Sequence, residues 1–339
     1  MERAPTMNIH KSPTTLSRVD PLKHVFRRIF SALPDGARGT VVAIIGEFLG
    51  TLCFIFFAFA GGEVAAASSN KKQNEGVSTG TASKNPALLL YVSLSAGFSL
   101  LIFVWIFFRV SGGLFNPVVS LGMALIGAIT WVRCAVLTVT QFVATIAASY
   151  MVEALFNGGL HVSTELGGDI SVAQGVLIEM ILTAQLIFTI FMLAAEKHAA
   201  TFLAPIGIGL SLFIAELVGV FWTGGSLNPA RSLAPCIVTK SFTSYHWIYW
   251  VGPISGTILA VLIYKLVKAL EYETLTGEEQ EELLPRPNAG KRRESSIIPL
   301  ASIHSVEIEP TQAPQKAPQK PIQKEVMEPG QVLPTMLAD

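Results

Sequence analysis

The stretches SGGLFNPV, residues 111–118, and TGGSLNPAR, residues 223–231, decide the fold of this chain. In each, two glycines precede an Asn-Pro pair, which begins at Asn116 or Asn228, and a short apolar segment follows. Asn caps the free N–H groups at a helix start, and Pro fits the first helical position. A helix start within a bilayer is tolerated only where the broken backbone is buried in protein or lines a watery cavity. The two stretches therefore predict a pair of half-helices at a pore or a substrate site.

The composition is that of a membrane protein. Mean hydropathy is +0.52, and 14% of the 339 residues are charged, whereas a soluble domain has about 25%. Lys plus Arg and Asp plus Glu balance at 24 each, so charge gives no indication of a nucleic-acid partner. The sequence has no metal-ligand or phosphate-loop spacing, and its three cysteines lie far apart. We therefore expect no catalytic residue, no metal site, no cofactor and no disulfide framework.

Six apolar stretches have the length of about 20 residues that a helix needs to cross a bilayer. They are Val41–Gly61, Pro86–Phe108, Trp131–Met151, Ser171–Ala195, Phe202–Thr223 and His246–Lys265. The expected fold class is an all-α membrane protein with six transmembrane helices and two re-entrant half-helices.

Basic residues are distributed unevenly around these spans. Those before the first span are Arg3, Lys11, Arg18, Lys23, Arg27, Arg28 and Arg38. Residues 155–174, in contrast, contain no Lys or Arg. Because Lys and Arg are enriched on the cytoplasmic side, we expect a cytoplasmic N-terminus, and six crossings return the C-terminus to the same side. The expected location is the plasma membrane, as a multi-pass protein.

The chain divides by composition into a membrane core and two tails. Residues 1–40 form a basic cytoplasmic tail, in which residues 21–34 are either an amphipathic helix on the inner leaflet or a simple topology signal. Residues 41–268 form the core. Residues 269–339 are rich in Glu, Pro, Gln and Lys, a composition that cannot bury a core, and are expected to form a disordered cytoplasmic tail.

The core contains an internal repeat, with one copy at about 41–153 and the other at about 171–268. Each copy has a span with a glutamate, a second span, an Asn-Pro half-helix and a third span. Because each copy crosses the membrane an odd number of times, the copies are inverted, and their half-helices meet near the midplane. Glu47 and Glu179 hold matching positions. A carboxylate in a span needs a partner, so we expect both to accept hydrogen bonds from the re-entrant loops, rather than only to pack between helices.

These features together resemble the aquaporins, the major intrinsic protein family. The resemblance covers about residues 41–268 and includes both Asn-Pro motifs, Gln141, Ser232 and the segment WIYWVGP at 247–253. One Asn-Pro pair is weak evidence, since Asn85 begins another at an ordinary helix start. Two pairs in register with six spans and an inverted repeat are specific.

The resemblance implies a homotetramer in which each subunit has its own pore. Asn116 and Asn228 are expected to offer amide donors at the pore midplane, so that a passing water accepts from both and the proton wire is interrupted. Pro117 and Pro229 are expected to support the half-helix starts. Arg231 is expected at the outer constriction, where a fixed positive charge excludes protons and cations, a device known in aquaporin-type pores. The alternative for Arg231 is snorkelling to the interface.

The other filter positions implied by the resemblance are Ala96, Glu216 and Gly225. Water-specific members usually carry an aromatic residue and a histidine at the positions of Ala96 and Glu216. Ala96 and Gly225 are both expected to widen the constriction. Glu216 has two compatible interpretations. It either pairs with a neighbouring donor such as Arg231 and holds it in place, or it lines the filter and accepts hydrogen bonds from hydroxyl-bearing solutes such as glycerol. The first motif ends in Val118 instead of Ala, as in some fungal and plant members.

The expected function is a passive channel for water that also passes small neutral solutes, glycerol or hydrogen peroxide, and excludes protons and ions. The markers disagree on the solute, because Ser232 and the pair Tyr249 and Trp250 resemble water-type members whereas the filter does not. One alternative is a proton-coupled transporter, since inverted repeats and broken helices also build transporters. Few intramembrane charges argue against it. A second alternative is a closed-pore scaffold or sensor whose tails bind partners.

Overall fold

The computed structural model describes residues 34–70, 85–196 and 199–272. The predicted amphipathic helix near residues 21–34 lies outside the described residues, except for residue 34. The predicted disordered tail, residues 269–339, also lies outside them, except for residues 269–272. Regular structure in the described part is entirely helical. The elements are α2 Asp35–Asn70, α3 Pro86–Phe107, α4 Pro117–Leu125, α5 Trp131–Leu155, α6 Val172–Ile190, the π-helical turn η1 Phe191–Ala195, the 3-10 turn η2 Ala199–Leu203, α7 Ala204–Thr223, α8 Pro229–Thr239 and α9 Ile248–Ala269.

Six of these helical segments are long and apolar enough to cross a membrane, which confirms the predicted spans. They are α2, α3, α5, α6 with η1, α7 and α9. The first differs from its prediction, because α2 continues well beyond Gly61 to Asn70. The segment after Gly62 contains three consecutive alanines, Ala65 to Ala67, and alanine is the strongest helix former. The extra turns of α2 carry Glu63.

The outer faces of the long helices are apolar and exposed. Phe57, Phe98, Val139, Ile214 and Leu262 each expose about half of their side chain or more. In a soluble domain such apolar side chains are normally buried. A bilayer is the solvent that suits them, so the packing agrees with the hydropathy.

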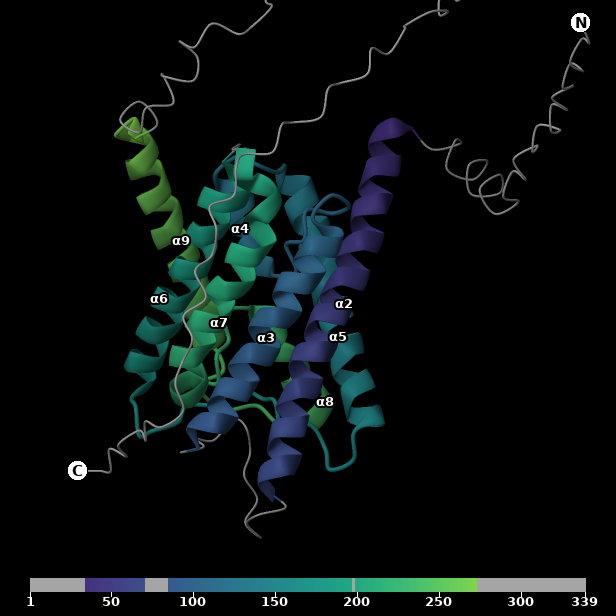
Figure 1. Ribbon diagram of the computed structural model, residues 1–339, viewed down its shortest axis with the longest axis vertical. Helices are drawn as coiled ribbons and strands as arrows, with labels where there is room; N and C mark the ends of the chain where they lie inside the picture. Colours follow the sequence, from purple (N-terminus) through teal and green to yellow (C-terminus); the bar gives the residue numbers. More distant parts are fainter. Residues whose placement is uncertain (1–33, 71–84, 197–198, 273–339) are drawn as a thin grey trace, which may run out of the picture. The chain divides into compact units, whose positions relative to one another are not determined.

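The half-helices α4 and α8 lie in opposite halves of the bundle. Figure 1 shows α4 in the upper half and α8 in the lower half, while α2 begins and α9 ends at the same upper end. Each half-helix packs against both α5 and α9, one from its own repeat and one from the other. This exchange of neighbours is what an inverted repeat with an axis in the membrane plane produces. The predicted fold class is therefore confirmed.

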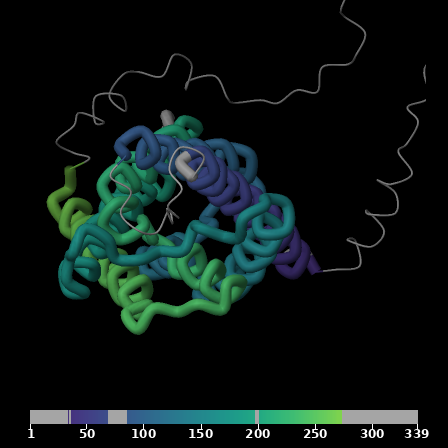
Figure 2. Tube along the Cα trace, turned by 90° about the horizontal axis from the view of Figure 1, so that it is seen from below, coloured from purple at the N-terminus to yellow at the C-terminus, as the bar shows by residue number. Residues whose placement is uncertain are grey.

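Glycines allow the long helices to approach closely at two crossings. A Cβ on Gly97 of α3 would lie 2.9 Å from the carbonyl oxygen of Gly209 in α7, and a Cβ on Gly209 would lie 2.8 Å from that of Gly97. At the second crossing, a Cβ on Gly256 of α9 would overlap the backbone of α6 at Met180. Small residues at helix contacts are typical of membrane bundles, where close packing replaces the hydrophobic effect. Figure 2 shows the helices end-on, side by side in one bundle.

Candidate functional site

The two asparagines of the repeated motif join the half-helices at the centre of the bundle. The Nδ2 atom of Asn116 donates to the carbonyl oxygen of Leu227 at 2.8 Å, and Nδ2 of Asn228 donates to that of Phe115 at 3.0 Å. Each asparagine thus binds the residue that precedes the other asparagine. Both side chains are buried, at 6% and 4% exposure. The predicted meeting of the half-helices is therefore a reciprocal pair of hydrogen bonds.

Each asparagine also caps its own half-helix. Oδ1 of Asn116 accepts from the backbone N–H of Val118, and Oδ1 of Asn228 accepts from that of Ala230, both at 3.0 Å. Pro117 and Pro229 occupy the first position of α4 and α8. Because the oxygens are used as caps, the amide N–H groups are the parts that remain for other partners.

The residues just before the asparagines have an unusual backbone. Phe115 has φ 51° and Leu227 has φ 50°, in the left-handed region that costs about 1–3 kcal/mol for a non-glycine residue. Their N–H groups are held by buried carboxylates, Phe115 by Oε1 of Glu47 at 2.5 Å and Leu227 by Oε2 of Glu179 at 2.9 Å. The opposite asparagine holds each carbonyl. Both polar groups of each strained residue are therefore fixed.

The two glutamates hold their loops with different sets of bonds. Oε1 of Glu47 also accepts from Nε2 of Gln141 at 2.7 Å. Oε1 of Glu179 accepts from Oγ1 of Thr223 at 2.6 Å and from the N–H of Ser226 at 3.0 Å. Both glutamates are completely buried. Among these contacts the Glu47 bonds end on one oxygen, whereas the Glu179 bonds use both.

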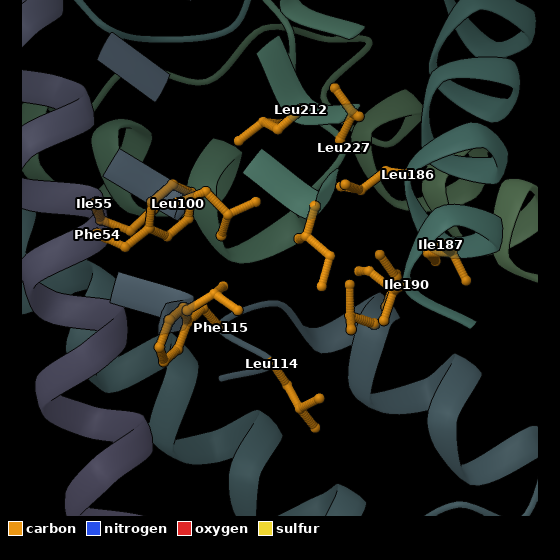
Figure 3. Close-up of a cluster of buried hydrophobic side chains, with 14 of the residues drawn as sticks. Phe54, Ile55, Leu100, Leu114, Phe115, Leu186, Ile187, Ile190, Leu212 and Leu227 are labelled. Carbon is orange, nitrogen blue, oxygen red and sulfur yellow. The ribbon is translucent and has the colours of Figure 1, made fainter. Parts of the chain in front are cut away.

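A cavity of about 560 Å³ runs beside this junction. It extends from Arg109 and Arg133, near the end of the bundle where α3 ends, to Val162 and Arg231, near the opposite end. Most of its wall is apolar, and Figure 3 shows side chains from several helices around this central region. The apolar lining residues labelled there are Phe54, Ile55, Leu100, Leu114, Phe115, Leu186, Ile190, Leu212 and Leu227.

Asn116, Asn228, Glu216 and Arg231 are polar groups in this wall, and Ala96 is a further lining residue. The wall of the cavity is thus mainly apolar and carries polar groups at a limited number of positions. Such a surface binds water weakly except at those groups, and it fixes the orientation of a molecule where they converge. The structure brings five of the predicted site residues to one cavity.

Arg231 is held by backbone carbonyls and an aromatic ring. Nη1 donates to the carbonyl oxygen of Val162 at 2.6 Å and Nη2 to that of Gly224 at 3.4 Å. The Cζ atom lies 5.1 Å from the ring centroid of Phe59 in α2, within cation–π range. Sequence reasoning missed Phe59 and Val162. A carbonyl acceptor carries no residue-type signal, and Phe59 is one of several phenylalanines in an apolar span.

Gly225 is not among the residues that line the cavity, although its neighbours Gly224 and Ser226 are, and its place in the filter stays a prediction. A Cβ built on Gly225 would overlap the carboxylate of Glu216. The space left by the missing side chain is therefore filled by Glu216, and Gly225 by itself does not widen the passage. Ala96, the other small residue of the predicted filter, does line the cavity.

Glu216 makes no direct ion pair with Arg231, whereas its pairing with another neighbouring donor stays a prediction. Among the described residues, the contacts within 4.0 Å between a basic nitrogen and an acidic oxygen join His161 to Glu63 and Lys268 to Glu196, and the first is an ion pair only when the histidine is protonated. Glu216 is 5% exposed and lines the same cavity as Arg231. The carboxyl group of Glu216 and the guanidinium of Arg231 thus line one cavity, while the guanidinium is bound to carbonyls.

Comparison with known proteins identifies the family to which this chain belongs. Residues 38–264 match the family described as "MIP: Major intrinsic protein". The chain belongs to the major intrinsic protein family. This confirms the resemblance found in the sequence. As a major intrinsic protein, the chain is a multi-pass integral membrane protein and a passive channel rather than an enzyme.

Fungal relatives are similar to this major intrinsic protein over most of its length. "Aquaporin-5" of Botryotinia fuckeliana (strain B05.10) is 57% identical over 278 residues, which are 82% of this chain and 73% of the relative. "Aquaporin-7" of the same fungus is 53% identical over 84% of this chain and 63% of the relative. "Probable aquaporin-5" of Gibberella zeae is 52% identical over 78% of this chain and 49% of the relative. The chain therefore spans between half and three quarters of the length of these relatives.

A solved structure confirms the fold of this major intrinsic protein. The X-ray structure of the aquaglyceroporin from Plasmodium falciparum has a TM-score of 0.56 and 20% sequence identity. The match covers 67% of this chain and 95% of the other. At that identity the likeness concerns the fold alone.

Proposed function

We propose that this chain is a passive channel through which water and small neutral solutes, such as glycerol and hydrogen peroxide, cross the membrane while protons and ions are excluded. The observation that carries the proposal is the reciprocal bonding of Asn116 and Asn228 to the opposite loops, in the wall of one cavity. The names of the fungal relatives and of the solved structure agree with it.

The asparagine geometry explains how water passes without protons. An amide nitrogen has two hydrogens, and one hydrogen of each asparagine is used on the opposite loop. The oxygen is used on the half-helix cap. Each of Asn116 and Asn228 therefore presents only a donor to the passage. A water between them accepts from both and turns its own hydrogens away, so no continuous chain of hydrogen bonds conducts a proton. The positive ends of α4 and α8 add to this orientation.

Arg231 supplies a second barrier in this proposal. Its guanidinium keeps its charge and is fixed by two carbonyls and by Phe59. A fixed positive charge in a narrow apolar passage repels hydronium and metal cations. It also offers N–H groups to a neutral solute that passes.

Glu216 gives the proposed filter a hydrogen-bond acceptor, which a filter with only an arginine would lack. Its carboxylate faces the cavity and is an acceptor only, whereas Arg231 is a donor only. A solute with hydroxyl groups can donate to the first and accept from the second at the same level of the passage. Ala96 leaves room for such a molecule. We therefore place glycerol-like solutes and hydrogen peroxide, together with water, among the permeants.

The arrangement of the protein in the membrane is part of the same proposal. Residues 41–268 are the channel, both termini are cytoplasmic, and the plasma membrane is the location. The chain functions as a homotetramer with one pore in each subunit. In support of one pore in each subunit, residues from both repeats of the chain line the cavity, among them Asn116 and Asn228.

The proposal is tested by light scattering of proteoliposomes that contain the full chain or its Glu216→His variant. Vesicles are shocked once with an impermeant osmolyte and once with glycerol. The proposal expects fast shrinkage in the first shock and rapid re-swelling in the second, with re-swelling reduced in the variant. Shrinkage no faster than in empty liposomes overturns the channel. Glycerol re-swelling that is equal in both proteins overturns the role of Glu216.

A further inference from the structure

A buried glutamate outside the repeated motifs holds the connection between α5 and α6. Oε1 of Glu63 accepts from the backbone N–H of His161 at 2.6 Å, and Oε2 lies 2.9 Å from Nδ1 of the same residue. Glu63 is 6% exposed, whereas His161 is 32% exposed. Figure 2 shows this connection, in teal, lying across the end of the bundle. We call Glu63 and His161 the loop clamp.

The loop clamp is one residue from the group that holds Arg231. Val162 follows His161, and its carbonyl oxygen accepts the 2.6 Å hydrogen bond from Nη1. A shift of the backbone at His161 therefore moves that carbonyl directly. The other guanidinium bond, to Gly224, is longer at 3.4 Å, so the Val162 carbonyl is the main anchor.

The same face of α2 contacts both the loop and the guanidinium. Phe59 and Glu63 are four residues apart, so they lie one above the other on the helix. Phe59 packs against the guanidinium, and Glu63 holds the loop. Between them, a Cβ on Gly62 would lie 2.8 Å from Cγ1 of Val162. Glycine at this position lets the loop lie against the helix. Three neighbouring positions of α2 thus form a seat for the loop and the arginine.

We propose that the loop clamp is a positioning device for Arg231, which keeps the guanidinium bound to the Val162 carbonyl and away from the carboxylate of Glu216. This inference rests on the proposed channel function. Opposite charges attract more strongly in a poorly hydrated passage than in water. Without the clamp, Arg231 turns toward Glu216, and the two side chains together narrow the filter. The clamp therefore keeps the passage open although both charges line it.

The test compares osmotic water permeability, per reconstituted channel, of the native chain, Glu63→Ala, Glu63→Gln and the double variant Glu63→Ala with Glu216→Gln. We expect Glu63→Ala to lower permeability about fivefold, the effect of losing one hydrogen bond of ordinary net strength. Glu63→Gln keeps an acceptor for the His161 N–H and stays within about twofold of native. The double variant recovers most of the native permeability, because the carboxylate that attracts Arg231 is gone.

The second mutation separates positioning from folding. If Glu63 only stabilised the protein, removing the Glu216 carboxylate would not restore the Glu63→Ala variant. Equal loss in the single and double variants, or native permeability in Glu63→Ala, overturns the inference. His161→Ala provides a variant at a partly buried loop position, 32% exposed, in case Glu63→Ala does not fold. It is expected to lower permeability in the same direction and to be rescued by Glu216→Gln, and absence of rescue overturns the inference as well. A native chain without permeability overturns the proposed function itself.

Discussion

The carboxylate of Glu216 occupies the space into which a side chain on Gly225 would project. Glu216 lies on α7, and Gly225 lies in the loop that leads to the second half-helix, with φ 63°. The glycine is therefore required twice, for its backbone conformation and for the room it leaves. Glu216 and Gly225, which were expected to act separately in the filter, therefore depend on each other, because the glycine leaves the space that the carboxylate fills.

Gly225→Ala is predicted to push the Glu216 carboxylate into the passage and to lower water permeability about tenfold, since a single misplaced group in a narrow pore obstructs it. The matched control is Gly127→Ala. Gly127 also has a positive φ, of 80°, but a Cβ there meets nothing within 4 Å. Both variants carry the backbone cost of about 1–2 kcal/mol. Stopped-flow light scattering should show loss only for Gly225→Ala. Equal permeability of both variants contradicts the shared-space account.

The reciprocal asparagine bonds predict equal and separate effects of two substitutions. Asn228→Ala leaves the carbonyl of Phe115 without its donor, and Asn116→Ala does the same to Leu227. Each loss of a buried partner and of a helix cap costs about 1–3 kcal/mol. The unfolding temperature in detergent should fall by several degrees for either variant. An unchanged temperature for one of them would show that its cross-loop bond contributes little.

Glu179→Gln is predicted to destabilise the protein more than Glu47→Gln. Both oxygens of Glu179 accept from loop donors, so an amide NH₂ must face an N–H of Ser226 or Leu227. The bonds that Glu47 makes to Phe115 and Gln141 end on one oxygen, which a glutamine can supply. We expect a difference of about 1–3 kcal/mol, the cost of one buried unpaired group. Thermal unfolding of the two variants side by side measures it, and a larger effect at position 47 contradicts the geometry.

Ala96→Phe is predicted to select against the larger permeant. Ala96 lines the cavity that also contains Glu216 and Arg231. A ring there fills space that glycerol needs, so glycerol permeability should fall about tenfold or more, with a smaller effect on water. The control is Ala135→Phe on the exposed face of α5. If Ala96→Phe leaves the ratio of glycerol to water permeability unchanged, Ala96 does not limit the passage.

The sequence was sufficient to predict the bundle and its repeat, because these depend on local signals. Apolar spans of fixed length and Asn-Pro helix starts are set by the bilayer and by backbone chemistry. The same signals led to Asn116 and Asn228, whose bonds now define the junction. Glu47 and Glu179 were found because a carboxylate in a span requires a partner, and both accept bonds from the loops.

The details of the filter could not be predicted, because they depend on the path of a loop. Nothing in the segment around His161 indicates that it crosses the bundle or that its backbone reaches Arg231. Glu63 gave one signal, a carboxylate two residues after the predicted end of the first span, but the span was expected to stop at Gly61. The carboxylate of Glu216 fills the space beside Gly225 because of how α7 packs against the following loop. The spacing of residues in the sequence does not predict that packing.

The most direct test of the central claim, a water passage that excludes protons, is one recording on one sample. Proteoliposomes that contain the native chain and an internal pH dye are given an osmotic shock and a pH step, with empty liposomes as the reference. The account predicts rapid shrinkage, well above that of empty liposomes, while the internal pH changes no faster than in the reference. Shrinkage equal to the reference, or proton entry accelerated together with water flow, would contradict it.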